Sequence, residues 1–147
     1  MSDCEETGPD PDLVARAVWD GMETGNRANA TLGTNVLDVG PGYATVAMTV
    51  TNAMANCHGM CHGGFVFALA DTAFGYAANS RGDKIVTQHG TITFIRPVRV
   101  GDRLVASAHE VAREGRSGIY DVSVAAGEET VAEFRGHSRT TGGRWVE

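Results

Sequence analysis

The segment from Gly64 to Asn79 constrains the fold more than any other part of this 147-residue chain. Its residues are apolar on nearly every side of a helix, and Asp71 is the only charged residue among them. A helix without a polar face must be buried all round, and one such helix needs a sheet wrapped around it. Small side chains would let other backbone approach it closely: Ala68, Ala70, Ala73, Gly75, Ala77 and Ala78.

Local patterns predict one further helix and six strands. Asp10 is placed to cap a short amphipathic helix that starts at Pro11 and ends near Met22. Residues 43–51 alternate between apolar and polar positions, which is typical of a strand with one buried face. With turn residues between them, the predicted strands are 31–39, 43–51, 85–95, 103–111, 119–125 and 130–140.

This order of elements predicts an α+β protein of the hotdog type, in which a curved antiparallel sheet wraps around one long central helix. We expect residues 1–10 to be a disordered tail and residues 11–147 to form a single domain.

Charge and composition argue against nucleic-acid binding, membrane spanning and export. The net charge of −6 and the pI near 5.3 argue against a nucleic-acid partner. No apolar run approaches the roughly 20 residues of a membrane span, and the acidic N-terminus is unlike a signal peptide. We therefore expect a cytoplasmic protein, with its three cysteines, Cys4, Cys57 and Cys61, as free thiols.

Asp71 is the first candidate for catalysis, because an unpaired carboxylate in an apolar interior costs several kcal/mol. The alternative is an aspartate satisfied by local hydrogen bonds or facing a wet groove. Gly63 and Gly64 open the central helix, whose free backbone N–H groups would suit a polarised carbonyl, unless these glycines only shape the loop. Asn56 could orient water or a carbonyl, or be an ordinary turn residue.

The spacing of Gly64 and Asp71 suggests a second subunit. Seven residues separate them, which is roughly 10 Å along a helix at about 1.5 Å per residue. A reacting carbonyl carbon must lie within about 3–3.5 Å of its attacking atom. If both groups act on one carbonyl, Asp71 must come from another chain, so we predict an active site at a homodimer interface.

Other residues allow other chemistry. The segment 57–62 holds two Cys and two His, but four ligands so close together rarely form a tetrahedron, and the haem spacing Cys-x-x-Cys-His does not fit. We expect no metal, and we regard a Cys57 or Cys61 nucleophile as the weaker alternative to Asp71. Five arginines could bind coenzyme A phosphates or be solvated surface charges: Arg96, Arg113, Arg116, Arg135 and Arg139.

Several motifs resemble those of the PaaI-type hotdog thioesterases of phenylacetate degradation. The specific pattern is Asn56-x5-His62-Gly63-Gly64 followed by Asp71. Broader hotdog features extend the similarity from about Ala15 to Gly143: Leu69 to Phe74, Asn79-Ser80, Phe94 to Pro97, Gly101-Asp102, Gly118 to Val122 and Phe134 to Gly136. The Cys57-His58 pair departs from the pattern but does not touch the three key positions.

The resemblance implies hydrolysis of an acyl-CoA thioester, with phenylacetyl-CoA or a ring-hydroxylated relative as the typical substrate. It implies that Gly64 donates its N–H to the carbonyl, that Asn56 positions water or substrate, and that Asp71 of a partner chain is base or nucleophile. It further implies a tetramer of two dimers and no cofactor, coenzyme A being part of the substrate. We expect substrate contacts at His62, Gly63, Arg96, Arg113, Arg116, Ser117 and Arg135.

Two rival functions remain. A hotdog dehydratase or hydratase would pair a catalytic His with an acid, and His62 and His89 are candidates for that role. A hotdog dimer could also bind acyl-CoA without turning it over.

Overall fold

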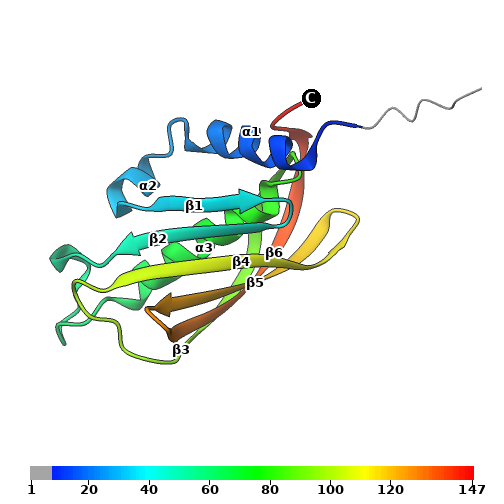
Figure 1. The fold of residues 1–147 in the computed structure, drawn as a ribbon. Coiled ribbons are helices and arrows are strands. Elements are labelled where there is room, and N and C mark those ends of the chain that lie inside the picture. Colours follow the sequence, from blue (N-terminus) through cyan, green and yellow to red (C-terminus); the bar gives the residue numbers. More distant parts are fainter. Residues whose placement is uncertain (1–7) are drawn as a thin grey trace, which may run out of the picture.

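A computed structural model describes residues 8–147, so that most of the predicted tail and Cys4 lie outside the described residues. Six antiparallel strands form one sheet in the order β1-β2-β4-β5-β6-β3, and α3 lies against one side of it (Figure 1). This is the predicted α+β arrangement. None of the described helices is long and apolar enough to cross a membrane. The elements are α1 (Pro11–Glu23), α2 (Arg27–Leu32), β1 (Asn35–Gly40), β2 (Tyr43–Thr49), a 3₁₀ turn (Asn52–Met54), α3 (Gly63–Asn79), β3 (Asp83–Phe94), β4 (Arg103–Glu114), β5 (Ser117–Ala126) and β6 (Glu129–Arg144).

The helix α2 replaces the start of the predicted strand 31–39. The Asn26 side chain accepts a hydrogen bond from the Asn29 amide at 3.2 Å, which caps its N-terminus. Gly33 ends it in the left-handed conformation, with φ 68°. The strand therefore begins only at Asn35, because residues 31 and 32 belong to a helix with a cap at each end.

A polar cluster ties α1 and α2 to α3. The Tyr76 hydroxyl donates to the Glu23 carboxylate, and Asn29 Nδ2 donates to the same hydroxyl at 2.8 Å. Burial, with the neighbouring Glu23 carboxylate, raises the pKa of Tyr76, so the hydroxyl stays protonated and keeps donating. The predicted cap of α1 is also present, since Asp10 accepts from the Asp12 amide at 3.0 Å.

The central helix is buried on the side that faces the sheet. Phe74 packs there against Tyr120 and Phe134, with ring centroids 5.5 and 5.9 Å apart. The prediction that the helix is buried all round is wrong for a single chain, because a stripe along α3 stays partly or fully accessible: Gly64, Ala68, Asp71, Thr72 and Gly75. The sheet of one chain curves around only part of the helix surface. The predicted buried face of β2 is confirmed by Ala44, Val46 and Met48, but Ala47 on the opposite face is buried as well.

Two glycines let the sheet approach α3 closely. Gly90 on β3 pairs directly with Gly136 on β6. A Cβ atom added at Gly136 would lie 2.9 Å from the rings of both Phe74 and Phe134. A side chain at this position would therefore push the helix away from the strands that hold it.

We expect Gly136→Ala to lower the free energy of unfolding by about 1–3 kcal/mol through overpacking, measured by urea denaturation. Gly21→Ala is the matched control. It adds the same methyl group to α1, where the new Cβ would contact the Trp145 ring at an ordinary 3.4 Å. This control should be neutral or slightly stabilising, because alanine favours a helix interior over glycine. Equal losses in the two variants would contradict the close approach at Gly136.

Candidate active site

Asn56 holds the loop that leads to α3. Its side-chain Oδ1 accepts hydrogen bonds from the backbone amides of His58 and Met60, at 2.9 and 3.1 Å. Its own backbone amide donates to the Met60 carbonyl at 2.6 Å. Within residues 8–147, Nδ2 of Asn56 has no hydrogen-bond partner. Asn56 is thus a turn residue on its oxygen side and keeps a free donor on its nitrogen side.

The N-terminus of α3 is capped by an imidazole. His62 Nδ1 accepts the hydrogen bond of the Gly64 amide at 3.0 Å. The predicted donor for a substrate carbonyl is therefore occupied within the chain. Gly63 is required for a different reason, since a Cβ there would lie 2.8 Å from the Phe94 ring. Both glycines shape the entry of the helix, and the Gly64 amide reaches a ligand only when the imidazole turns away.

A cavity of about 280 Å³ lies beside this helix entry. It brings together three predicted residues, Asn56, Gly63 and Arg96, although the Arg96 guanidinium already donates to the Thr130 carbonyl at 2.5 Å. The rest of the lining is largely apolar: Met60, Cys61, Val66, Phe94, Pro97 and Val98. A cavity of this kind suits a compact apolar group with a polar end near the helix N-terminus.

Asp71 lies half-buried on the accessible stripe of α3, and it is not among the residues that line this cavity. Its Oδ1 accepts a hydrogen bond from the Thr87 hydroxyl on β3 at 2.8 Å. Thr87 was not predicted as a site residue, and its sequence context carries no signal, because the register between a strand and a helix is a tertiary feature. The hydrogen bond fixes the carboxylate at the side of α3 that faces the edge of the sheet.

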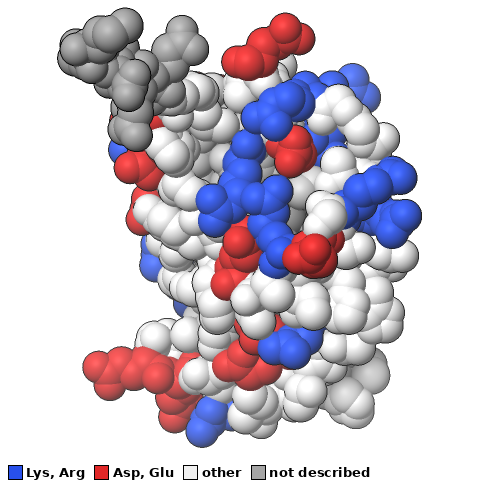
Figure 2. Space-filling model, turned by 90° about the vertical axis from the view of Figure 1, so that its right-hand side faces the viewer, with Lys and Arg blue, Asp and Glu red and all other residues white. Residues whose placement is uncertain are grey.

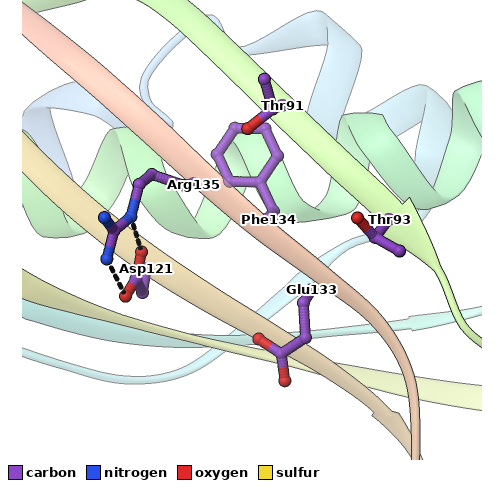
Figure 3. Close-up of a pocket in the computed structure, with 6 residues that line it drawn as sticks. All are labelled: Thr91, Thr93, Asp121, Glu133, Phe134 and Arg135. Carbon is purple, nitrogen blue, oxygen red and sulfur yellow. Dashed lines mark hydrogen bonds and ion pairs between the residues drawn. The ribbon is translucent and has the colours of Figure 1, made fainter.

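The structure does not bring the remaining predicted residues to the cavity within one chain. Arg113, Arg116 and Ser117 lie at the β4–β5 turn, beside the far end of α3. Arg135 lies on the outer face of the sheet, where it contacts both carboxylate oxygens of Asp121 at 2.6 and 2.8 Å (Figure 3). This guanidinium holds the pKa of Asp121 below its usual value.

The alternative chemistries find little support. Burial raises the pKa of the Cys61 thiol, which disfavours the thiolate that a nucleophile requires. Cys57 is exposed and free. No group of three or more metal-ligating side chains occurs in residues 8–147. His89 packs against His137 on the outer face of the sheet, with ring centroids 5.2 Å apart, and so lies on the opposite face of the sheet from α3.

A carboxylate on the central helix, backbone amides at the helix N-terminus and an apolar cavity on this fold are features of the class of hotdog acyl-thioester enzymes. The model of the thioesterase superfamily matches residues 58–133. The chain belongs to the thioesterase superfamily, which confirms the predicted hotdog fold and the predicted class of thioester hydrolases.

Individual relatives agree with this assignment. The acyl-coenzyme A thioesterase PaaI of Escherichia coli is 46% identical over 114 residues, which cover 76% of this chain and 81% of the relative. The solved structure of the E. coli PaaI protein from the phenylacetic acid degradation operon has a TM-score of 0.89 at 39% identity. The match covers 92% of this chain and 99% of that one. A Streptococcus mutans protein bound to acetyl-CoA has a TM-score of 0.73 at 26% identity, covering 76% and 90%.

Substitutions can distinguish the role of the Asn56 side-chain oxygen from that of its Nδ2 donor. Asn56→Asp keeps an oxygen that accepts from His58 and Met60 but removes the Nδ2 donor, whereas Asn56→Ala removes both. We expect both variants to lose turnover, and only Asn56→Ala to lose stability as well, by about 1–3 kcal/mol. Thioester hydrolysis and urea denaturation check this. Wild-type turnover of Asn56→Asp would show that Asn56 serves the loop alone.

Proposed function

We propose that this protein hydrolyses acyl-CoA thioesters with Gly64 and Asn56 of one chain and Asp71 of a second. The observation that carries the proposal is the apolar cavity at the N-terminus of α3, where Asn56 and Gly63 meet. A relative named as an acyl-CoA thioesterase and a similar structure with acetyl-CoA bound support the choice of coenzyme A thioesters. Coenzyme A is part of the substrate, and the proposed reaction uses no metal or other cofactor.

In the proposed mechanism the acyl group enters the cavity and its carbonyl oxygen replaces the His62 imidazole as acceptor of the Gly64 amide. One hydrogen bond is exchanged for another, so the net cost of opening the cap is small. The bond strengthens as negative charge develops on the oxygen. Asn56 Nδ2 donates to the attacking species or to the substrate.

Asp71 of the partner then acts in one of two ways. As a general base it takes a proton from water, the water oxygen bonds to the carbonyl carbon, and the carbon–sulfur bond breaks. As a nucleophile it forms an acyl anhydride and releases the thiolate, and water then hydrolyses the anhydride. In both routes the products are the free acid and the thiol of coenzyme A.

The free edge of the sheet supports a homodimer. β3 pairs with β6 on one side only, and its other backbone edge is unpaired within residues 8–147. Val86 and Phe94 on this strand are 51% and 52% exposed. An unpaired apolar strand edge is a template for pairing with another chain. Pairing β3 with its own copy about a two-fold axis makes the two strands, and the two α3 helices, antiparallel.

This pairing also resolves the spacing of the catalytic groups. Antiparallel α3 helices related by an axis near Phe67 would set Gly64 of one chain level with Asp71 of the other. The small accessible residues of α3, Ala68 and Gly75, would let the two helices approach. Two such dimers form the tetramer that the resemblance implies. The cytoplasmic location expected from the sequence stays a prediction.

Asp71→Asn should lower kcat by roughly 10²–10⁴-fold or more, because the base is lost while Oδ1 still accepts from Thr87. Steady-state thioester hydrolysis measures the rate, and urea denaturation should show unchanged stability. A variant that keeps the wild-type rate would refute the role of Asp71.

The arrangement across chains is tested by co-expressing Asp71→Asn and Asn56→Ala chains that carry different tags. The mixed dimer has one site with an intact Asn56 and an intact Asp71, so it should recover about half of the wild-type activity per dimer. If the two residues act within one chain, both sites stay damaged and no activity returns.

Phenylacetyl-CoA and hydroxyphenylacetyl-CoA are the substrates we propose, because the cavity is compact and mostly apolar. We expect kcat/KM for these two to exceed that for a long straight-chain acyl-CoA such as palmitoyl-CoA by at least about tenfold. A panel of aryl and aliphatic thioesters checks this. A preference for long aliphatic chains would contradict the aryl substrate but not the hydrolysis.

A further inference from the structure

Two histidines on neighbouring strands form a pair on the outer face of the sheet. His89 on β3 lies directly opposite His137 on β6 in the strand register. Their ring centroids are 5.2 Å apart, and the ring planes are inclined by 59°. His89 is exposed and His137 is half-buried. No side-chain hydrogen bond or ion pair joins either imidazole to another residue between 8 and 147, so the ring nitrogens are available to a ligand.

The separation of the two rings matches that of two imidazoles bound to one metal ion. A tetrahedral zinc ion lies about 2.0–2.1 Å from each imidazole nitrogen that binds it. With a tetrahedral angle between the two bonds, the centroids of the two rings are then roughly 5 Å apart. The backbone holds the pair at this distance, because residues directly opposite each other on antiparallel strands have Cβ atoms about 4.5–5.5 Å apart. The sheet therefore positions two ligands that no loop has to bring together.

This pair is separate from the proposed catalytic groups. Gly90 and Gly136 form the next register pair, and both face α3, so His89 and His137 point away from that helix. Asp71 lies on the helix side of the sheet, and the proposed reaction uses no metal. The cysteine-containing loop before α3 does not contribute to the pair either. Another role is therefore open to these two histidines.

Positive charge on the same face limits how strongly the pair can bind a cation. Arg135 and Arg139 flank His137 on the outer face of β6, two residues away in each direction. Asp121 neutralises Arg135 through two contacts, at 2.6 and 2.8 Å (Figure 3). Arg139 is exposed and forms no ion pair with any residue from 8 to 147. The charge of Arg139 is thus the nearest one that would repel a metal ion.

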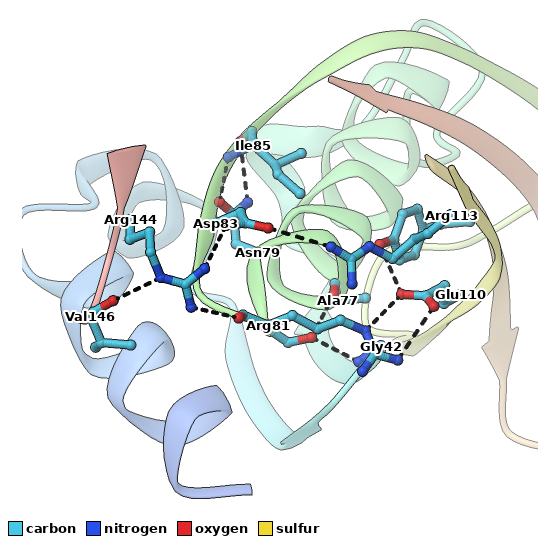
Figure 4. A network of polar contacts seen from close by, with 12 residues as sticks. Gly42, Ala77, Asn79, Arg81, Asp83, Ile85, Glu110, Arg113, Arg144 and Val146 are labelled. Atoms are coloured by element: carbon cyan, nitrogen blue, oxygen red, sulfur yellow. Dashed lines mark hydrogen bonds and ion pairs between the residues drawn. The ribbon is translucent and has the colours of Figure 1, made fainter. Parts of the chain in front are cut away.

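Further cations gather at the adjoining end of the molecule, where β4 turns into β5. Figure 2 views this end, and Lys and Arg outnumber Asp and Glu on its upper part. Several of these cations are already bound to carboxylates (Figure 4). The ion pairs are Asp83–Arg113 at 3.4 Å, Asp83–Arg144 at 2.7 Å and Glu110–Arg81 at 3.1 Å. A metal ion at the histidine pair would therefore be held by its ligands and not by a surrounding negative field.

We propose that His89 and His137 together bind one divalent transition-metal ion, of the class of Zn²⁺, Ni²⁺ and Cu²⁺, on the outer face of each chain. Neutral imidazole is a preferred ligand of these ions. Two protein ligands leave positions for water, consistent with a structure in which residues 8–147 hold no group of three or more metal-ligating side chains. The bound ion would link β3 to β6 and so stabilise the edge strand of the sheet.

The first test measures Ni²⁺ binding by isothermal titration calorimetry on untagged protein. Cys4 and Cys57 are replaced by serine in every sample, which removes two thiols that could bind the ion elsewhere. We expect one ion per chain. His89→Gln and His137→Gln should each weaken binding tenfold or more, because each substitution removes one of the two protein ligands.

His109→Gln is the matched control. His109 is exposed on the same outer face, but Asp121 and not a histidine lies opposite it on β5. This variant should bind Ni²⁺ as the unaltered protein does, and urea denaturation without metal should show equal stability in all three variants. An equal loss of affinity in all three, or unchanged affinity in His89→Gln or His137→Gln, would overturn the proposal.

The second test uses the charge of Arg139. Arg139→Gln should raise the Ni²⁺ affinity about two- to fivefold, because it removes a weak, solvent-screened repulsion. A fall in affinity would contradict the position of the site.

The third test links metal binding to stability. Ni²⁺ should raise the urea midpoint of the unaltered protein but not that of His137→Gln, because the two ligands lie together only when β3 and β6 are paired. An equal rise in both proteins would place the ion elsewhere and overturn the proposal.

Discussion

The apolar helix α3 has more surface than the sheet of its own chain can cover. The sheet buries the side that carries Leu69, Ala73 and Phe74, while the stripe through Ala68, Asp71 and Gly75 stays accessible. Partial accessibility of this stripe lowers the cost of placing a carboxylate on an apolar helix, since full burial without a partner would cost several kcal/mol. The same stripe lies toward the unpaired edge of β3, so one uncovered surface holds the carboxylate and is the surface that the proposed second chain would cover.

In the proposed mechanism the same backbone amide, that of Gly64, serves both the structure of the helix N-terminus and catalysis. The His62 imidazole accepts the hydrogen bond of the Gly64 N–H, which avoids leaving this donor without a partner. Exchanging the imidazole for a substrate carbonyl would replace one acceptor of this amide by another, so opening the cap would cost little. The His62 cap therefore stabilises the start of α3, and a substrate carbonyl could still displace it. Gly63 contributes by letting the Phe94 ring lie close to this entry.

Local patterns allowed much of this to be predicted from sequence. The apolar run with its single Asp71 predicted the central helix, and alternation in residues 43–51 predicted the buried face of β2, because both depend only on nearby residues. The helix α2 was missed although Asn26 and Gly33 carry cap signals, since six residues hold too little periodicity. The His62 cap was missed because histidine is not a preferred N-cap residue. Thr87 could not have been found, since its contact with Asp71 depends on how a strand lies on a helix.

The arginines show why residue type alone cannot identify a ligand site. Asp121 accepts from Nε and Nη2 of Arg135, so a phosphate at that edge of the guanidinium would first have to displace a carboxylate. Arg96 lines the cavity, yet its guanidinium is bound to the Thr130 carbonyl. Arg139 forms no ion pair with residues 8–147, but on β6 it shares the outer face of the sheet with Arg135 and His137, opposite α3. What distinguishes these residues is the partner that each already has and the face of the sheet on which each side chain lies, and both depend on tertiary structure.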